Sequence, residues 1–250
     1  MFLQIKSLLN KIRTERPLIL NLTNSVTMDF VANGLLSLGA SPIMTNAEEE
    51  LEDLLKISKA LVINIGTLDE QFVKLAKRAC ELANQLNAAI ILDPVGVGAS
   101  EYRTKTCLEL MENYRFAIIR GNASEIKCLA GELVTSKGVD SLESSESAAK
   151  SALALAAQFK TSIVVSGATD IVANAEKFEK YAYGSALMPQ ITGSGCLLSA
   201  VVAAFHAVEQ DSFEAAKLAS IFYSLCGERA EKNSQGPGSF KVNFIDELSR

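Results

Sequence analysis

An aspartate follows one of the apolar runs that predict buried strands. Asp93 comes directly after the run 89–92 and leads into Pro94 and a loop that contains Gly96 and Gly98. Ligands of open α/β sheets bind at the carboxyl ends of the strands, and a carboxylate placed there is costly unless it holds a cation or pairs with a charge. Asp-Pro followed by glycine is also an ordinary way for a strand to enter a turn, so the motif alone leaves both interpretations open.

Two further charged residues follow the next predicted strand, 117–119. Arg120 stands at the end of this strand, where a guanidinium can contact nucleotide phosphates. Glu125 falls in the first turn of the helix predicted over 123–129. Asn122 and Glu125 also have the spacing of a capping box, and this structural role can coexist with a catalytic one.

A glycine-rich turn, ITGSGCLL over 191–198, leads into a long apolar helix. Gly193 and Gly195 allow the backbone to approach a ligand closely, and the free N–H groups of a helix start favour a transferring phosphoryl group. Cys196 lies at this helix start, where a thiol has a lowered pKa and is expected to be partly thiolate near neutral pH. The alternative is a small buried residue of the first turn. Such turns are common, so this motif is a weak signal by itself.

These motifs are more specific together than singly. Asp93, Arg120, Glu125 and the turn 193–196 all lie where a strand ends or a loop enters a helix, which is one edge of the predicted sheet. Mg²⁺ takes few protein carboxylates and completes its coordination with water and phosphate oxygens. Phosphoryl transfer depends chiefly on positioning and on neutralising charge. The combination therefore suits Mg²⁺ and a polyphosphate.

The elements that must position these residues alternate along the chain. Short apolar runs typical of parallel strands covered by helices lie at 18–22, 42–44, 61–65, 89–92, 117–119 and 162–165. Segments of helical period lie between them, at 26–38, 47–58, 70–86, 104–113, 123–129 and 145–159. This repetition predicts an α/β fold with a mostly parallel central sheet flanked by helices.

The pattern changes after Ser166. A short antiparallel hairpin is predicted over 170–175 and 177–184, followed by helices at 196–208, 212–232 and about 239–248. The serine-rich stretch 136–147 is the best candidate for a surface loop. No linker or repeat divides the sequence, so residues 1–250 are expected to form one domain.

Composition excludes several classes of function. The 24 basic and 29 acidic residues are interspersed and give a net charge of -5, which argues against nucleic acid or an anionic membrane as partner. The five cysteines include no CxxC pair, which favours a reducing compartment. The single histidine, His206, lies in an apolar helical pattern, so neither a multi-histidine metal site nor a Ser-His-Asp hydrolase is expected. No apolar run has transmembrane length, and residues 1–11 lack the features of a signal peptide, so we expect a cytoplasmic protein.

Taken in order, the motifs resemble a known family. DPVGVGAS (93–100), RGNASEI (120–126), VVSGATDIV (164–172) and ITGSGCLLSAV (191–201) resemble hydroxyethylthiazole kinase of thiamin salvage. NLTNSVT (21–27) and ASPIM (40–44) resemble the thiazole-binding region of that family. The resemblance covers nearly the whole chain, whereas the DPV and GxGC elements alone would indicate only the broader ribokinase-like superfamily.

The resemblance implies a ribokinase-like fold and an enzyme that phosphorylates the primary hydroxyl of 5-(2-hydroxyethyl)-4-methylthiazole with ATP. It also implies a homotrimer with active sites between subunits. Related sugar kinases usually carry Asp at the position of the catalytic base, where this chain has Cys196. By resemblance, the thiazole pocket is formed by Asn24, Val26, Met44 and Gly193, and ATP is bound by Arg120, Ser166 and Gly195. Mg²⁺ is held by Asp93 and Glu125, and the catalytic base is Cys196.

Three alternatives compete with this interpretation. A related kinase of hydroxymethylpyrimidine, pyridoxal or a sugar would share the Mg·ATP residues, but the N-terminal segments and Cys196 speak against it. A non-catalytic nucleotide-binding paralogue would be expected to lose Asp93, Arg120, Glu125 or the glycine-rich turn, and the sequence retains all of them. A nucleotide-dependent dehydrogenase is disfavoured because no GxGxxG follows the first predicted strand.

Overall fold

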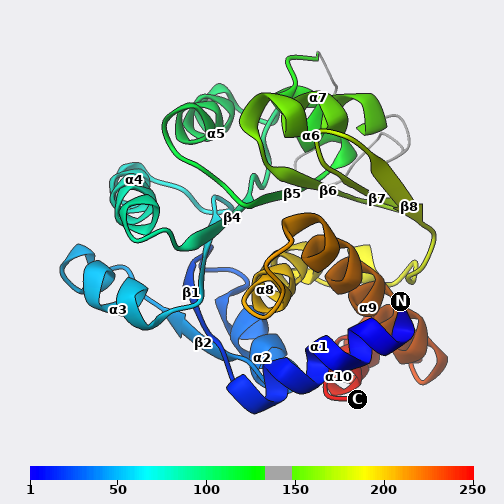
Figure 1. Cartoon of the computed structure of the whole chain (residues 1–250). Coiled ribbons are helices and arrows are strands. Elements are labelled where there is room, and N and C mark those ends of the chain that lie inside the picture. Colours follow the sequence, from blue (N-terminus) through cyan, green and yellow to red (C-terminus); the bar gives the residue numbers. More distant parts are fainter. Residues whose placement is uncertain (133–147) are drawn as a thin grey trace.

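A mostly parallel sheet crosses the middle of the molecule, and helices cover both of its faces (Figure 1). The structure is a computed structural model that describes residues 1–132 and 148–250. Within these residues eight strands pair in the order β2-β1-β3-β4-β5-β6-β7-β8. All neighbours from β2 to β6 pair in parallel, and β7 and β8 are antiparallel. The strands are β1 (Leu18–Leu22), β2 (Ser41–Met44), β3 (Ala60–Asn64), β4 (Ala89–Asp93), β5 (Ile118–Asn122), β6 (Ser162–Ser166), β7 (Asp170–Ala173) and β8 (Phe178–Tyr181).

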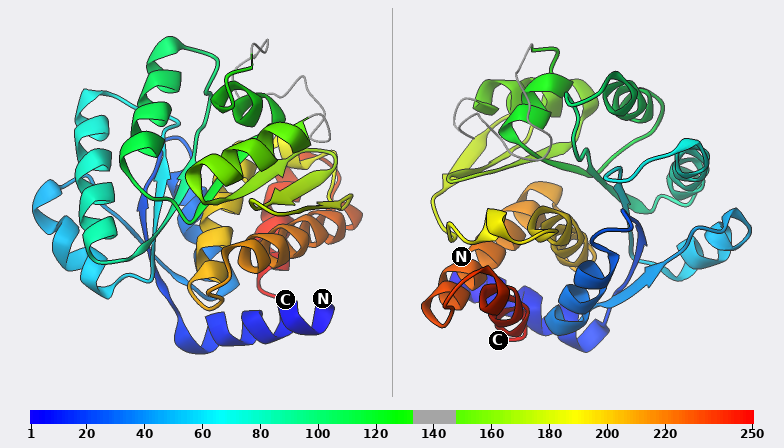
Figure 2. Two further views of the ribbon diagram at one scale, coloured as in Figure 1. Left: turned by 45° about the horizontal axis from the view of Figure 1, so that its top comes forward. Right: turned by 180° about the vertical axis from the view of Figure 1, so that it is seen from behind.

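Two groups of helices form the outer layers (Figure 2). One face of the sheet packs against α1 (Phe2–Glu15), α2 (Met28–Leu38), α8 (Ser194–His206), α9 (Ser212–Lys232) and α10 (Pro237–Leu248). The other face packs against α3 (Leu51–Ile57), α4 (Glu70–Gln85), α5 (Glu101–Asn113), α6 (Ala123–Leu129) and α7 (Ala149–Phe159). Two short 3₁₀ helices, η1 (Glu48–Glu50) and η3 (Met188–Gln190), lie in the connections.

The strands are apolar on both faces because both faces are buried. In β4, Ile90 and Leu92 pack into the layer of α3 to α7, whereas Ile91 packs on the opposite side. This is the arrangement expected of parallel strands covered by helices. The α/β fold with its mostly parallel sheet and its antiparallel hairpin is therefore confirmed, while the single domain over 1–250 stays a prediction.

Most predicted elements are confirmed, with three differences. The helix predicted over 104–113 begins at Glu101, because Ser100 accepts a hydrogen bond from the Arg103 N–H and caps it. The N-terminal helix α1 was not predicted at all. Residues 133–147, which include the whole of the predicted serine-rich loop (136–147) and the first residues of the helix predicted over 145–159, lie outside the described part of the chain.

The sheet order indicates the edge at which a ligand is expected to bind, and the site residues were predicted at this edge. The order 2-1-3-4-5 is that of a doubly wound sheet, which binds ligands outside the carboxyl ends of the strands near β1 and β3. Helix α8 packs over β1, β3 and β4. Ser199 in its second turn donates a hydrogen bond to Asp93 at the end of β4, so α8 begins beside the carboxyl ends of these strands.

His206 has a structural role, as predicted. It is buried at the end of α8, and its Nε2 lies 3.0 Å from the hydroxyl of Ser212, at the start of α9. Among residues 1–132 and 148–250, no helix combines the length and the apolar character needed to span a membrane.

Candidate active site

Asp93 is the buried centre of the predicted site. Its Oδ2 accepts hydrogen bonds from Asn64 Nδ2, at 2.7 Å, and from the Ser199 hydroxyl, at 2.9 Å. Its Oδ1 is buried without a hydrogen bond from the described residues, and Arg120 Nη1 lies 3.6 Å away. Burial raises the pKa of Asp93, and the Arg120 guanidinium partly opposes that rise. Oδ1 therefore pairs with the charge of Arg120 but accepts no hydrogen bond from the described residues.

Glu125 links the start of α6 to the loop after β4. Its Oε2 accepts the N–H of Asn122 at 2.8 Å, while the Asn122 side chain accepts the N–H of Glu125 at 2.9 Å, so the predicted capping box is present. Its Oε1 accepts the N–H of Gly96 at 2.8 Å. Burial, reinforced by the charge of Asp93, raises the pKa of Glu125 to about 7. The capping residue is therefore also a buried, titratable neighbour of Asp93.

Arg120 lies against the first turn of α8. Its guanidinium donates to the hydroxyl of Ser166, at the end of β6. A Cβ at position 195 would come within 2.6 Å of Arg120 Nη1, so a side chain there would displace the guanidinium from its present position at this helix start. Residues predicted to contact ATP, namely Arg120, Ser166 and Gly195, are thus brought together from β5, β6 and α8.

The Cys196 thiol faces Asn24. Asn24 Nδ2 donates to Cys196 Sγ, at 3.3 Å, and to Asn64 Oδ1, at 2.9 Å. Burial raises the pKa of Cys196, and the nearby Asp93 carboxylate raises it further. The predicted lowering of this pKa is therefore wrong, because desolvation and a neighbouring negative charge outweigh the hydrogen bonds and the Arg120 charge that favour the thiolate. The thiol is protonated at neutral pH.

Of the other residues predicted to contact the thiazole, Gly193 lies at the start of α8, whereas Val26 and Met44 lie elsewhere. Gly193 has a φ of 94°, and a Cβ there would lie 2.9 Å from Thr27 Cγ2, so this glycine seats the turn on the start of α2. Val26 is 68% exposed. Met44 ends the edge strand β2, which is three places from β4 in the sheet. The structure therefore does not bring Val26 and Met44 into the cluster around Asp93, and their contact with a substrate stays a prediction.

We expect the free energy of unfolding of the ligand-free protein to fall as the pH rises from 4.5, the ordinary pKa of a glutamate, to about 7, the pKa of Glu125 in the fold. In this range the folded state binds more protons than the unfolded state, so the slope of stability against pH is negative. The full shift corresponds to about 3 kcal/mol. Urea unfolding across this pH range measures the slope, and Glu125→Gln should make it shallower. Equal slopes in the two proteins would contradict the raised pKa.

Comparison with known proteins decides the family. The family model described as "Hydroxyethylthiazole kinase family" matches residues 9–250. The chain belongs to the hydroxyethylthiazole kinase family. A protein of Brachyspira hyodysenteriae named hydroxyethylthiazole kinase is 44% identical over 245 residues, which cover 98% of this chain and 92% of that relative.

Solved structures agree with this family and with its fold. A hydroxyethylthiazole kinase protein from Pyrococcus horikoshii matches with a TM-score of 0.90 at 38% identity, over 99% of this chain and 93% of that one. A ribokinase-like superfamily protein from Enterococcus faecalis matches with a TM-score of 0.69 at 14% identity, over 97% and 93% of the two chains. The second likeness shows the fold alone, and the ribokinase-like fold is confirmed.

Two residues of the cluster around Asp93 were not predicted from the sequence. Asn64 ends β3 beside Asp93 and contacts both Asp93 and Asn24. Its signal, a polar residue within an apolar run, resembles that of Asp93 but was counted into the predicted strand. Ser199 lies in the apolar run of α8, and no local pattern predicts that this helix crosses the end of β4.

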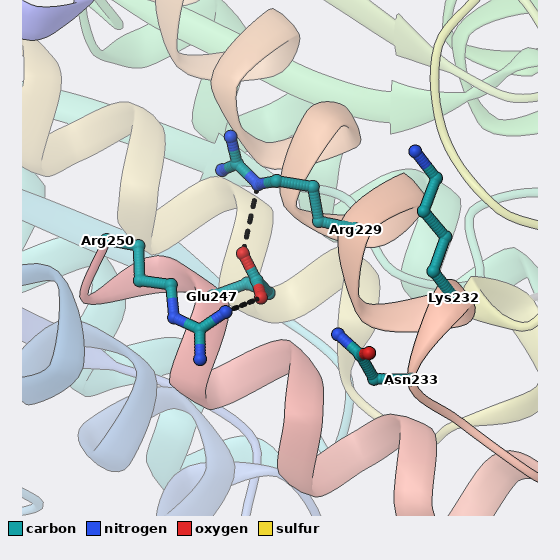
Figure 3. A pocket seen from close by; sticks show the side chains of 5 residues that line it. All are labelled: Arg229, Lys232, Asn233, Glu247 and Arg250. Carbon is teal, nitrogen blue, oxygen red and sulfur yellow. Dashed lines mark hydrogen bonds and ion pairs between the residues drawn. The ribbon is translucent and has the colours of Figure 1, made fainter.

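A hollow of about 320 Å³ lies elsewhere in this hydroxyethylthiazole kinase family member, between α9 and α10 (Figure 3). Buried Glu247 forms ion pairs with two arginines there: Arg229 Nε lies 3.0 Å from its Oε2, and Arg250 Nη1 lies 2.5 Å from its Oε1. Lys232 and Asn233 complete the lining. Because these arginines neutralise an internal carboxylate, and because the predicted site residues lie elsewhere, the candidate active site is the edge of the sheet.

Proposed function

We propose that this chain transfers the γ-phosphoryl group of ATP to the primary hydroxyl of 5-(2-hydroxyethyl)-4-methylthiazole, in thiamin salvage. The observation that carries the proposal is the cluster of Asp93, Arg120 and Cys196 at the first turn of α8, in a chain of the hydroxyethylthiazole kinase family. The cluster offers a cation position, a position for phosphate charge and a group for the acceptor alcohol. Transfer of a phosphoryl group requires little else.

The carboxylates fit Mg²⁺. Asp93 Oδ1 is a buried carboxylate oxygen without a hydrogen bond from the described residues, and Mg²⁺ prefers oxygen ligands. Both oxygens of Glu125 already accept backbone N–H groups, so Glu125 suits a metal-bound water better than the ion itself. Bound Mg²⁺ supplies neutralisation of the phosphate charge. The described residues hold no group of three or more His, Cys, Asp or Glu suited to a metal, as is usual for an ion that keeps several waters.

Arg120, Ser166 and the first turn of α8 are proposed to bind the phosphates of ATP. Arg120 is nearly buried, and its Nε has no hydrogen bond from the described residues. A phosphate oxygen would satisfy this donor and would pair with the guanidinium charge. Gly195 keeps a side chain away from the helix start, so the free N–H groups there can face the same anion.

Cys196 is proposed to receive the acceptor alcohol. Its neutral sulfur can accept a hydrogen bond from the hydroxyl and hold the oxygen for attack, while Asn24 orients the sulfur from the other side. In a loose transition state the alcohol loses its proton late, so a weak base suffices. Only the thiolate form of Cys196 can take this proton, and the raised pKa of the thiol makes that form a minor fraction at neutral pH.

Replacing Cys196 is expected to lower turnover and to leave ATP binding intact. Cys196→Ala should reduce kcat by about 100-fold, the low end of what a general base contributes, because the alcohol loses its acceptor while Arg120 and Ser166 remain. Cys196→Asp should stay active, since a carboxylate can take the same proton. Steady-state kinetics and calorimetric ATP titration measure both effects. An inactive Asp variant that folds and binds both substrates would count against the assignment of Cys196 as base.

The proposal includes a homotrimer with active sites between subunits. Val26 is 68% exposed in the single chain although it follows the buried Asn24 by two residues. A neighbouring subunit that completes the thiazole pocket would cover it. Light scattering would then give a mass three times that of the 26.8 kDa chain.

The five cysteines are free thiols, which suits the proposed cytoplasmic location.

An ADP-release assay with Mg·ATP tests the function directly. Hydroxyethylthiazole is offered beside hydroxymethylpyrimidine, pyridoxal and ribose, and the products are identified by mass spectrometry. Turnover of the thiazole alone, lost when Mg²⁺ is chelated, is the expected result. Turnover of another alcohol would keep the Mg·ATP site and overturn the substrate. If the protein binds ATP but phosphorylates none of the four alcohols, a non-catalytic paralogue would be favoured.

A further inference from the structure

Arg103, in the first turn of α5, reaches back to two loops at the carboxyl edge of the sheet. Its Nη1 donates to the carbonyl of Ile65, at 2.8 Å, and to that of Val95, at 2.7 Å. Its Nη2 donates to the carbonyl of Gly66, at 2.8 Å. None of the ion pairs found among residues 1–132 and 148–250 includes Arg103. Its guanidinium therefore donates hydrogen bonds to backbone carbonyls of two separate segments.

The loop after β3, which holds Ile65 and Gly66, supports the thiol side of the site. The Gly66 N–H donates to Asn64 Oδ1 at 2.9 Å. A Cβ at position 66 would lie 2.8 Å from Asn24 Cβ, so the Gly66 backbone packs directly on Asn24. Asn24 in turn donates to the Cys196 sulfur. A shift of this loop would move Asn24 and with it the partner of the thiol.

The loop after β4, which holds Val95 and Gly96, supports the carboxylate side. It follows Asp93 directly, and the Val95 N–H donates back to the Asp93 carbonyl at 2.9 Å. The Gly96 N–H donates to Glu125 Oε1. Gly96 has a φ of 77°, and a Cβ there would lie 3.2 Å from Arg103 Cδ, so the loop packs on the arginine stem. A shift of this loop would change the distance between Asp93 and Glu125.

We propose that Arg103 is a positioning residue for phosphoryl transfer, which fixes the loop of the carboxylates relative to the loop that supports Asn24 and Cys196. The proposal rests on the proposed function of this site. The planar fork of a guanidinium donates several hydrogen bonds in fixed directions, whereas an ammonium group is a point charge on a flexible stem. Lysine at this position cannot hold both loops in the same geometry.

The test compares Arg103→Lys and Arg103→Met with the wild type. Lys105→Met is the matched control, because Lys105 lies on the same helix, is exposed and pairs with Glu101 at the surface. We expect kcat to fall about 10- to 100-fold in both Arg103 variants, with the half-saturating Mg²⁺ concentration raised, since displaced supporting residues cost this much at metal and catalytic sites. Lys105→Met should match the wild type.

Chemical rescue separates positioning from a role in folding alone. In Arg103→Ala, guanidinium chloride at non-denaturing concentration is expected to restore part of kcat, and the wild type and Lys105→Met should not respond. Thermal unfolding and circular dichroism give the folded fraction of each variant. Wild-type kcat and Mg²⁺ dependence in folded Arg103→Lys and Arg103→Met would overturn the proposal, as would a loss of activity that equals the unfolded fraction and is not rescued.

Failure of the proposed function is recognised separately in the wild type. If the wild type phosphorylates a different alcohol, the same comparison is made with that alcohol. If it phosphorylates none of the four, amide hydrogen exchange of residues 64–67 and 94–98 is compared between Arg103→Met and wild type. Faster exchange in both loops, with α5 still protected, is expected. Unchanged exchange in the two loops would overturn the proposal.

Discussion

Asp93→Asn is expected to lower kcat on the order of 10³-fold, the loss typical of removing a group that stabilises transition-state charge. The amide has the same shape and can still contact Asn64 and Ser199, but it offers the metal no negative charge. Asp93 is completely buried, and burial raises its pKa. Neutralising it removes a desolvation cost, but it also leaves the nearly buried Arg120 guanidinium without its counterion. Because these two effects oppose one another, we expect the melting temperature to stay within a few degrees of the wild-type value.

Single-turnover phosphorylation and a Mg²⁺ titration measure this effect. Asp53→Asn is the matched control, because its side chain is 86% exposed and lies on α3, away from the site. It should leave kcat and the Mg²⁺ requirement unchanged. Near-wild-type turnover by folded Asp93→Asn would remove Asp93 from the metal site and would leave Glu125 as the only carboxylate proposed for it.

Arg120→Gln is expected to raise the KM for ATP about 100-fold, since hydrogen bonds to charged groups contribute about 1.5–3 kcal/mol. A second effect follows from Asp93. The guanidinium lowers the pKa of Asp93 against the effect of burial, so its loss raises that pKa further. The acid limb of the pH–activity profile should therefore move to higher pH in the variant.

Initial rates over a range of ATP concentration and pH measure both effects. Arg115→Gln is the matched control, because Arg115 immediately precedes the β5 region and its exposed guanidinium contacts only a backbone carbonyl of Asn84 among the contacts described. It should change neither the KM nor the pH profile. An Arg120→Gln enzyme with a wild-type KM for ATP would show that the phosphates bind elsewhere.

Local sequence patterns were sufficient to predict the strands and the edge of the sheet at which the site lies. Each apolar run that ends in a charged residue correctly indicated the carboxyl edge of the sheet, because all the strands concerned run parallel. The missed helix α1 had such a signal too. Its residues Ile5, Leu8, Leu9 and Ile12 are buried at helical spacing.

The site itself depends on contacts that no local pattern contains. Cys196 stands at a helix start, which alone predicts a reactive thiolate. Its surroundings come from 100 and more residues away in sequence: Asn24 from the loop after β1, and Asp93 from β4. Burial of the thiol among these segments and the charge of Asp93 together raise its pKa. The same holds for Arg103, whose spacing within α5 predicts nothing about the two loops that it joins.

The position of Arg120 beside Asp93 has a consequence for the order in which ligands bind. The ligand-free site already contains a cation and an anion that partly compensate one another. A metal ion alone would pair with Asp93 and leave Arg120 uncompensated, and a nucleotide alone would do the reverse. Each would leave a buried charge without a partner, which is costly. Metal and nucleotide are therefore expected to bind cooperatively and with reciprocal coupling, so that the site selects their complex over either one alone.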